Sequence, residues 1–465
     1  MVFFDKLRQN FSHVRESWFL ASLYLFCGCI CVAFLAAIVP PFENSDEFNH
    51  LKRVDQILTG HLIAWKHGTP ARSGGKVEVG IDQLDQIYGA MRFHAEVKVT
   101  PDMIRRGSMI RLGNRGYQDF SNTAIYSPLL YIPNVVGLGM ARLIHVNLHH
   151  ALIVSRAFGG VACVLLGALS IYLMPGVGAT FLFVILSLPM TLSLFASISQ
   201  DGLMICSATL AAALMARIGS LASSRPDTAL RVLFVLVTLL TLGRPAYAPL
   251  IFIPFFFASR ENWRSLLKYC LISLLIVGAW SLLVKFFVMI PMWEGRSSSG
   301  QVLFLLHHPF HAIRLVVSAF TSHQGMEGIA FWKEMIGVLG WIDVVLPAWF
   351  YDLTALVLIA VLVSGWRAGL DARSLLNSSF ITLILAGSIF LIFLLEYITF
   401  TPVGADYVFG VQGRYFIPLL PFMVFLMPMR EAPRIAWSAR ALALCWMLLS
   451  VDVTLYRVTA RYYIP

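Results

Sequence analysis

The stretch WFLASLYLFCGCICVAFLAAIV, residues Trp18–Val39, is followed without a break by PPFENSDEFNHLKRVDQILTG, residues Pro40–Gly60. The first part has no charged side chain and is long enough to cross a lipid bilayer as one α-helix. The second part places charged and titratable side chains within eight consecutive positions: Asp46, Glu47, His50, Lys52 and Arg53. The sequence therefore predicts a membrane-spanning helix that leads directly into a polar cluster at the membrane edge.

The composition of the whole chain is typical of a protein that crosses the membrane many times. Of its 465 residues, 58% are hydrophobic and only 13% are charged, whereas a soluble domain has about a quarter of its residues charged. The net charge of +10 does not indicate a nucleic-acid partner, because basic residues gather in the cytoplasmic loops of membrane proteins and no basic-aromatic motif occurs. The seven cysteines all lie in apolar runs, so we expect neither disulfides nor a metal site from them.

The distribution of positive charge predicts the orientation of the chain. Lys6, Arg8 and Arg15 precede the first span, so we expect a cytoplasmic N-terminus and a first span that is retained as an anchor. The segment Tyr126–Val146 is apolar enough to span, but counting it as a span would put the basic loops that follow it outside. We therefore expect a juxtamembrane helix in the outer interface at this segment.

The remaining apolar runs predict an all-α membrane protein with about eleven spans, in a range of ten to thirteen, and an outward C-terminus. After Trp18–Val39, the expected spans are Ala151–Leu173, Ala179–Ile198, Gly202–Ile218, Leu230–Leu242, Tyr247–Phe257, Cys270–Ile290, Val344–Val363, Leu376–Leu395, Tyr415–Met427 and Ala441–Tyr456. They form a single integral membrane domain, 1–465, with two extracytoplasmic segments. The first, residues 40–150, should contain interfacial helices, and the second, residues 291–341, an amphipathic helix around His311–Phe320.

This orientation puts the notable polar groups on one face of the membrane, which indicates a site. They are the Asp46 cluster, Asp201, the His307–His323 group, Glu396, Asp406 and Arg414.

The stretch NSDEFNHLKR has a structural and a functional interpretation. Asn44 and Glu47 have the spacing of a capping box, so the acids could simply begin an interfacial helix. Asp46 and His50 are four residues apart and would share a helix face. In the functional interpretation, Asp46 is a general base for a sugar hydroxyl, and His50 orients it or binds phosphate.

Two further polar groups allow a metal as well as a structural role. Asp201, in SISQDGL, could cap a helix or supply a second carboxylate for a metal or a sugar hydroxyl. His307 and His311 have a chelating spacing, but no HExxH pattern accompanies them. Ordinary hydrogen bonds or phosphate binding are the alternatives for these histidines.

Arginines that enter the expected membrane region suggest anion binding. Arg414, in VQGRYFIPLLPF, opens a span from the outside, and Arg244, in LGRPAY, lies between two short spans. A guanidinium fork suits a phosphate group, whereas the structural alternative is contact with lipid headgroups. The sequence has no Rossmann, Walker, GxSxG or HExxH pattern, so a soluble nucleotide-sugar enzyme is excluded and a lipid-borne substrate is favoured.

Seven short motifs follow one another between Pro40 and Pro421. They are PPFENSDEFNHLKR, YSPLLYIPNVVGLGMARLI, SR at Ser155–Arg156, LPMTLSLFASISQDGL, GRPAY, IGVLGWIDVVLP and VQGRYFIPLLP. In their order and spacing they resemble a family of bacterial multi-spanning membrane proteins that is similar to the GT-C superfamily of glycosyltransferases.

The resemblance implies a donor, a fold and roles for several residues. GT-C enzymes use polyprenyl-phosphate or polyprenyl-diphosphate sugars and carry an acidic residue just after the first span, which corresponds to Asp46 with Glu47 beside it. Many have a second acidic residue that corresponds to Asp201 and in some members helps to hold a divalent cation. Arg414 is the best match for a basic residue near the lipid phosphate. The soluble C-terminal domain of some members is missing, so acceptor recognition would come from the outer loops.

We therefore expect a glycosyltransferase of the bacterial inner membrane that transfers a sugar from a polyprenyl-phosphate donor to an envelope glycan or lipid acceptor at the extracytoplasmic face. Asp46 would be the base, supported by Glu47 or His50. The expected substrate- or phosphate-binding residues are Arg414, Arg244, Arg53, Tyr415 and Gln412. A divalent cation, Mg²⁺ or Mn²⁺, at Asp201 is an option rather than a requirement.

Two other functions fit the composition. A transporter or flippase of lipid-linked glycans would carry ionisable residues along the membrane midplane, whereas the charges here lie mostly at the outer ends of the spans. A non-catalytic scaffold for envelope assembly would tolerate replacement of Asp46.

Overall fold

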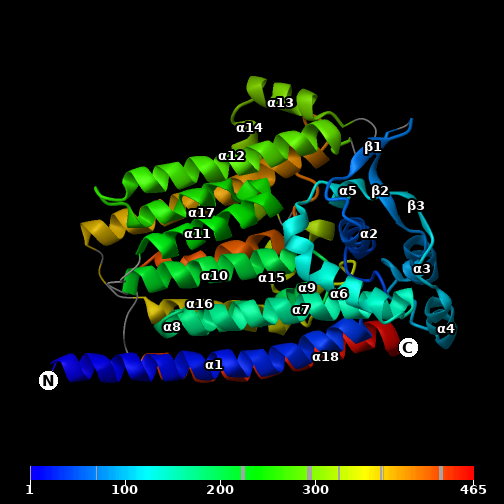
Figure 1. Cartoon of the computed structure of the whole chain (residues 1–465). Helices are drawn as coiled ribbons and strands as arrows, with labels where there is room; N and C mark the ends of the chain where they lie inside the picture. The colour runs from blue at the N-terminus through cyan, green and yellow to red at the C-terminus, as the bar shows by residue number, and fades with distance from the viewer. Residues whose placement is uncertain are drawn as a thin grey trace.

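Long helices dominate the computed structural model, which describes residues 2–69, 71–220, 226–290, 296–322, 325–366, 369, 371–428 and 433–465. Seven of the described helices are long and apolar enough to cross a membrane. They are α1 (Val2–Ile38), α7 (Leu148–Leu173), α10 (Asp201–Ser220), α12 (Trp263–Phe287), α16 (Ala348–Gly365), α17 (Ala372–Phe400) and α18 (Pro433–Tyr463). Figure 1 shows them side by side and nearly parallel, with the sheet of β1, β2 and β3 beyond one end of the bundle. A membrane protein with many spans is thereby confirmed.

Two helix pairs are sharply bent, and the sequence predicts one of them as a single span. The predicted span Ala179–Ile198 consists of α8 (Gly176–Leu186) and α9 (Pro189–Phe195), which meet at 67°. Pro189 explains the break, because proline lacks a backbone donor and disfavours a helical residue before it. The pair α13 (Ser298–His307) and α14 (His311–Thr321) is bent by 101°. Counting each pair as one span gives up to nine candidates among the described residues, so the predicted count of about eleven is not confirmed.

Two other predicted spans are short 3₁₀ helices with internal prolines. They are η3 (Pro245–Phe257) and η5 (Gly413–Phe425), of 13 residues each. Their prolines, at two interior positions in each helix, remove α-helical hydrogen bonds. At about 2.0 Å per residue, each reaches roughly 26 Å, well beyond the ~20 Å of an α-helix of this length. α11 (Pro226–Gly243) precedes η3 and covers the predicted span Leu230–Leu242.

The segment between α1 and α7 contains a sheet as well as helices, which corrects the all-α prediction. Its helices are α2 (Glu47–Leu58), α3 (Gly80–Tyr88), η1 (Gly89–Met91), α4 (Pro101–Met109), α5 (Ser121–Ala124), η2 (Pro128–Tyr131) and α6 (Ile132–Leu143). Strands β1 (Trp65–His67), β2 (Arg72–Glu78) and β3 (Arg115–Asp119) form an antiparallel sheet in the order β1-β2-β3. The register pairs Gly74 with Asp119 and Glu78 with Arg115. A Cβ at Gly74 would lie 2.0 Å from the carbonyl oxygen of Gln118, so this pairing needs glycine.

The segment Tyr126–Val146 does not form a full span, as the sequence predicted. It forms η2 and the 12-residue α6, which is not among the candidate spans. α6 packs along α7, where Gly137 lies against the backbone of Ser155. The side-chain amide of Asn134 also donates to the carbonyl of Ser155.

The second predicted outer segment also mixes short helices with strands. α14 confirms the helix expected around His311–Phe320. After it come η4 (Met326–Gly328), α15 (Phe331–Gly337) and a hairpin of β4 (Val338–Leu339) and β5 (Val344–Val345). Val344 was predicted to begin a span, but the helix starts later, at Ala348, because Val344 and Val345 pair in the hairpin.

A buried charge cluster holds α2, α6 and the sheet together. Arg142 on α6 contacts both Asp55 on α2 and Glu78 on β2, the latter at 2.8 Å. Arg115 on β3 lies 2.7 Å from the other Asp55 oxygen. The Asp55 side chain is 1% exposed, so its charge depends on these partners.

We predict that Asp55→Asn lowers the free energy of unfolding by about 2 kcal/mol, since it removes one of the two buried carboxylates that Arg115 and Arg142 share and leaves Glu78 alone to balance them. Thermal unfolding of the detergent-purified protein would measure the change. Asp102→Asn is the matched control, because Asp102 contacts Arg105 and Arg106 on an exposed surface and should leave the Tm unchanged. Equal Tm values for the wild type and Asp55→Asn would contradict the prediction.

Candidate functional site

The site begins at the C-terminal end of α1, which a buried arginine closes. The guanidinium of Arg156, on α7, is fully buried and donates to the carboxylate of Glu47 from Nε at 2.7 Å and from a terminal nitrogen at 2.5 Å. It also donates to the carbonyl of Ala36, in the last turn of α1, and to those of Val39 and Pro40, the two residues that follow the helix. Helix ends leave such carbonyls unpaired, so one side chain satisfies them and a buried carboxylate together.

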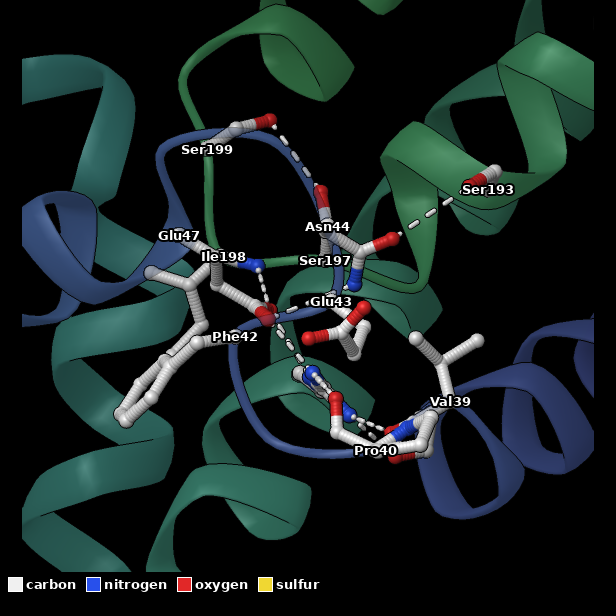
Figure 2. A network of polar contacts seen from close by, with 12 residues as sticks. Val39, Pro40, Phe42, Glu43, Asn44, Glu47, Ser193, Ser197, Ile198 and Ser199 are labelled. Carbon is white, nitrogen blue, oxygen red and sulfur yellow. Dashed lines mark hydrogen bonds and ion pairs between the residues drawn. The ribbon is translucent and has the colours of Figure 1, made fainter. Parts of the chain in front are cut away.

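Glu47 is held from a second side as well. The backbone N–H of Ile198 donates to its Oε1 at 2.9 Å, as Figure 2 shows, and the amide of Asn44 donates to its Oε2 at 3.4 Å. The side chain has no exposed surface. We therefore assign Glu47 a structural role and do not include it among the groups that contact a substrate.

Asp46, one residue earlier, is the N-cap position of α2 and has an unusual backbone. Its φ is 61°, a left-handed conformation, and its side chain makes no capping hydrogen bond. The predicted capping box that starts at Asn44 is therefore wrong, because α2 begins only at Glu47. Asparagine and aspartate tolerate this conformation best among residues with a side chain. The Asp46 carboxylate is 37% exposed and accepts from the side-chain amide of Asn122 at 3.1 Å.

Arg414 lies between the two predicted carboxylates. Its Nε is 3.5 Å from Asp201 Oδ2, and a terminal nitrogen is 4.0 Å from Asp46 Oδ2. Its Nε is buried and has no hydrogen-bond partner within the described part of the chain. The guanidinium is thus held near two anions by charge while some of its donors stay unused.

Arg244 approaches Asp201 from the other side. A terminal nitrogen lies 3.9 Å from Asp201 Oδ1, and the guanidinium stacks 3.4 Å above the centre of the Tyr415 ring. The hydroxyl of Tyr247 donates to the carbonyl of Tyr415 at 2.7 Å and links η3 to η5. Both arginines stand near the start of a 3₁₀ helix, because Arg244 is the N-cap of η3 and Arg414 is the second residue of η5.

His50 is buried next to these charges and is neutral. Its Nδ1 is 2.6 Å from the Tyr131 hydroxyl, and its ring stacks on Tyr126. Burial lowers the pKa of His50 to about 4, although the nearby Asp46 and Asp201 act in the opposite direction. A neutral imidazole does not supply a positive charge for phosphate, so the role left for His50 is to position α2 beside Tyr131.

Glu334, which the sequence analysis did not single out, fixes the start of η5. Its carboxylate accepts from the backbone N–H groups of Gly413 and Met326, each at 2.6 Å. A Cβ at Gly413 would lie 2.1 Å from the carbonyl oxygen of Phe331, so only glycine allows this approach. Burial raises the pKa of Glu334 to about 7. A lone glutamate in FWKEMIG has no sequence signal, because its partners are backbone groups. Glu396, on α17, also interacts electrostatically with Arg244 and Arg414.

Two cavities are lined by residues of α15 and η5. The first, beside Arg414, has a mixed lining: polar side chains that include Asn44, Ser193, Ser197, Glu334 and Gln412, and apolar side chains that include Met190, Leu194 and Val338. The second is a groove lined only by apolar side chains, including Phe320, Phe331, Trp332, Phe416, Leu420 and Met423. Glu334 and Arg414 line the first cavity and Phe331 and Phe416 the second, so the same two elements contribute to the walls of both.

The remaining predicted residues lie elsewhere or are already occupied. Arg53 is fully buried and donates to Gln56 and to the carbonyls of Leu62 and Tyr126, so we do not place it in the site. His307 bonds to the Leu303 carbonyl and His311 to the Ala405 carbonyl. These two histidines do not share a helix, because α13 ends at His307 and α14 begins at His311.

The predicted chelating spacing of this pair is therefore wrong, and His323 lies outside the described residues. The described residues hold no cluster of three or more metal-ligating side chains. The Asp201 carboxylate faces two guanidinium groups, an arrangement that does not favour a divalent cation at the same oxygens.

Comparison with known proteins gives one family. The family described as "Predicted membrane protein (DUF2142)" matches residues 29–423, which include Asp46, Asp201, Arg244 and Arg414. Because the match covers most of the chain, the protein belongs to this family. Neither the curated proteins nor the solved structures gave a match.

We predict that Arg156→Met destabilises the protein by about 3–5 kcal/mol, because it leaves the Glu47 carboxylate buried without its partner. The measurement is the Tm and the yield of monodisperse protein on gel filtration. The double variant Arg156→Met with Glu47→Gln should recover part of the loss. A single variant as stable as the wild type would show that Glu47 does not depend on Arg156.

The neutral His50 predicts a specific pH dependence of stability. Its pKa is about 4 in the fold and near 6.5 when unfolded, so protonation favours the unfolded chain between these values. Its contribution is complete above pH 6.5 and is lost as the pH falls towards 4. Between pH 7.5 and pH 5 it amounts to about 2 kcal/mol. The loss of Tm over this range should be smaller in His50→Gln, and an equal loss in both proteins would contradict the prediction.

Proposed function

We propose that this member of the DUF2142 family is a glycosyltransferase of the bacterial inner membrane. It would transfer a sugar from a polyprenyl-phosphate donor to an envelope glycan or lipid acceptor at the extracytoplasmic face. The observation that carries the proposal is the position of Arg414, which faces Asp46 and Asp201, lines one pocket, and lies on the helix η5 whose later residues line an apolar groove. The sequence resemblance to the GT-C superfamily supports it.

The two arginines would bind the phosphate. Their distances to the carboxylates, 3.5 to 4.0 Å, are longer than those of a closed bidentate pair, so an anion can accept from them without breaking a tight salt bridge. Stacking on Tyr415 holds the Arg244 plane in place. Arg414 and Arg244 then form two forks around one carboxylate, Asp201, which keeps both charged and oriented.

The apolar groove would hold the lipid chain. Phe416, Leu420 and Met423 of η5 line it, so it continues along the same helix that carries Arg414. Phe320 and Trp332 enclose it from α14 and α15. A ligand with one negative charge at Arg414 and a long apolar tail matches this order of surfaces.

Asp46 would act as the general base. The partly exposed Asp46 carboxylate takes the proton of the acceptor hydroxyl while the acceptor oxygen bonds to the anomeric carbon. The bond between that carbon and the phosphate oxygen breaks, and the electron pair leaves with the lipid phosphate. Arg414 and Arg244 stabilise the charge that develops on this oxygen. The products are the glycosylated acceptor and polyprenyl phosphate, and no step requires a metal.

The test is transfer activity in a deletion strain whose surface glycans are read by mass spectrometry. Asp46→Asn should lower product formation by about 10²-fold or more, the typical contribution of a general base. Asp406→Asn is the matched control, because Asp406 is exposed and makes no contact with the arginines in the described structure. Membrane levels of all variants would be compared by immunoblot.

The Arg414→Met variant helps to distinguish a glycosyltransferase from a flippase or a scaffold. It should weaken binding of polyprenyl phosphate to the purified protein about 10-fold or more, since a charge-assisted contact to phosphate is lost. Full restoration of the surface glycan by Asp46→Asn would contradict the proposed glycosyltransferase activity. If Arg414→Met also loses binding of polyprenyl phosphate, the two results together would favour a flippase.

A further inference from the structure

We propose that the pocket beside Arg414 receives an uncharged, polyhydroxylated sugar, and that Asn44 and Gln412 select it. The inference rests on the proposed function and adds the class of sugar and the residues that recognise it. Apolar side chains such as Met190 and Leu194 form part of the pocket wall, and its uncharged polar side chains are amides and hydroxyls, namely Asn44, Ser45, Ser193, Ser197, Ser199 and Gln412. Each of these groups can both donate and accept, as sugar hydroxyls do.

The charged groups of the pocket are already committed. Glu334 gives one oxygen to the Met326 N–H and the other to the Gly413 N–H, both at 2.6 Å, so its carboxylate is turned to the backbone. Arg414 faces Asp46 and Asp201 and the place assigned to the phosphate. Within the pocket lining an amino sugar would therefore meet only the Glu334 carboxylate, which is already engaged, and an acidic sugar would compete with the phosphate for Arg414.

Asn44 is held loosely enough to turn to a ligand. Its amide nitrogen is 3.4 Å from Glu47, and its amide oxygen is 3.5 Å from the Ser193 hydroxyl, both near the limit for a hydrogen bond. Figure 2 shows Asn44 between Ser193 on one side and Ser197 and Ser199 on the other. A sugar hydroxyl at normal bonding distance would replace these long contacts with shorter ones.

Gln412 is the second amide, and it has no competing partner. Its side chain is half-buried in the pocket wall and makes no hydrogen bond to any residue that the structure describes. It precedes Arg414 by two residues, and Asn44 precedes Asp46 by two residues. The two amides are thus carried on the same short loops as the proposed phosphate ligand and the proposed base, which would fix the ring between them.

The test is the affinity of the purified full-length protein for four lipids, measured by native mass spectrometry in detergent. They are polyprenyl phosphate alone and polyprenyl phosphate that carries a neutral hexose, an amino sugar or a uronic acid. The wild type should bind the hexose lipid about 10-fold or more tightly than either charged-sugar lipid. The ratio of affinities for hexose lipid over sugarless lipid should fall about 3- to 10-fold in Gln412→Ala and in Asn44→Ala.

Gln83→Ala is the matched control, because Gln83 lies exposed on α3 and should leave the ratio unchanged. Gln412→Ala removes no internal hydrogen bond, so it keeps the test valid if Asn44→Ala folds poorly. An unchanged ratio in Gln412→Ala, or charged-sugar lipids that bind as tightly as the hexose lipid, would overturn the inference and leave the proposed function standing. If Arg414→Met and the wild type bind the sugarless lipid with the same affinity, the proposed function is contradicted, and the inference with it.

Discussion

The rest of the site depends on the buried ion pair between Arg156 and Glu47. A guanidinium without exposed surface satisfies a carboxylate and the final carbonyls of α1 together, so the first helix ends at one defined place against α7. Neither charge could remain buried alone, because an unpaired ion in such surroundings costs several kcal/mol. The chain after α1 must therefore turn with Glu47 facing inward, and Asp46, its neighbour, is forced into a left-handed turn that faces the arginines.

The constraint on α1 is matched by one on η5. The Glu334 carboxylate accepts from the backbone N–H of Gly413, at the start of η5, and from that of Met326, at the start of η4. Gly413 allows α15 to approach η5 without a side chain between them. Arg414 follows directly. The carboxylate of Asp201, at the start of α10, then faces both Arg244 and Arg414. The starts of α2, α10, η3 and η5 and the end of α1 are thus brought close together with the help of buried groups. This is how a chain with few charges can keep several of them near one another.

The sequence predicted those features that depend on local pattern. The long apolar runs gave α1, α7, α10, α12, α16, α17 and α18, since length and hydropathy define a span. The broken pair at Pro189 and the 3₁₀ helices were read as spans because composition alone does not show the path of the backbone. The β1-β2-β3 sheet was missed because its longest strand, RSGGKVE, has glycines in place of an alternating pattern. The sequence also identified four charged side chains at the ends of apolar segments, where a charge is energetically unfavourable: Asp46, Asp201, Arg244 and Arg414. The structural role of Glu47 was not predicted, because its partner Arg156 lies 109 residues away in the sequence.

The geometry of η5 also sets how a bound chain would be aligned with the charge. In a helix of three residues per turn, side chains at i and i+3 are eclipsed, whereas in an α-helix each such step would rotate them by about 60°. Leu420 and Met423, which line the apolar groove, are therefore in the same row as Arg414. The prolines keep this winding from relaxing to an α-helix. η5 thus places a cationic group and the apolar side chains of the groove in one line, over about 18 Å from residue 414 to residue 423.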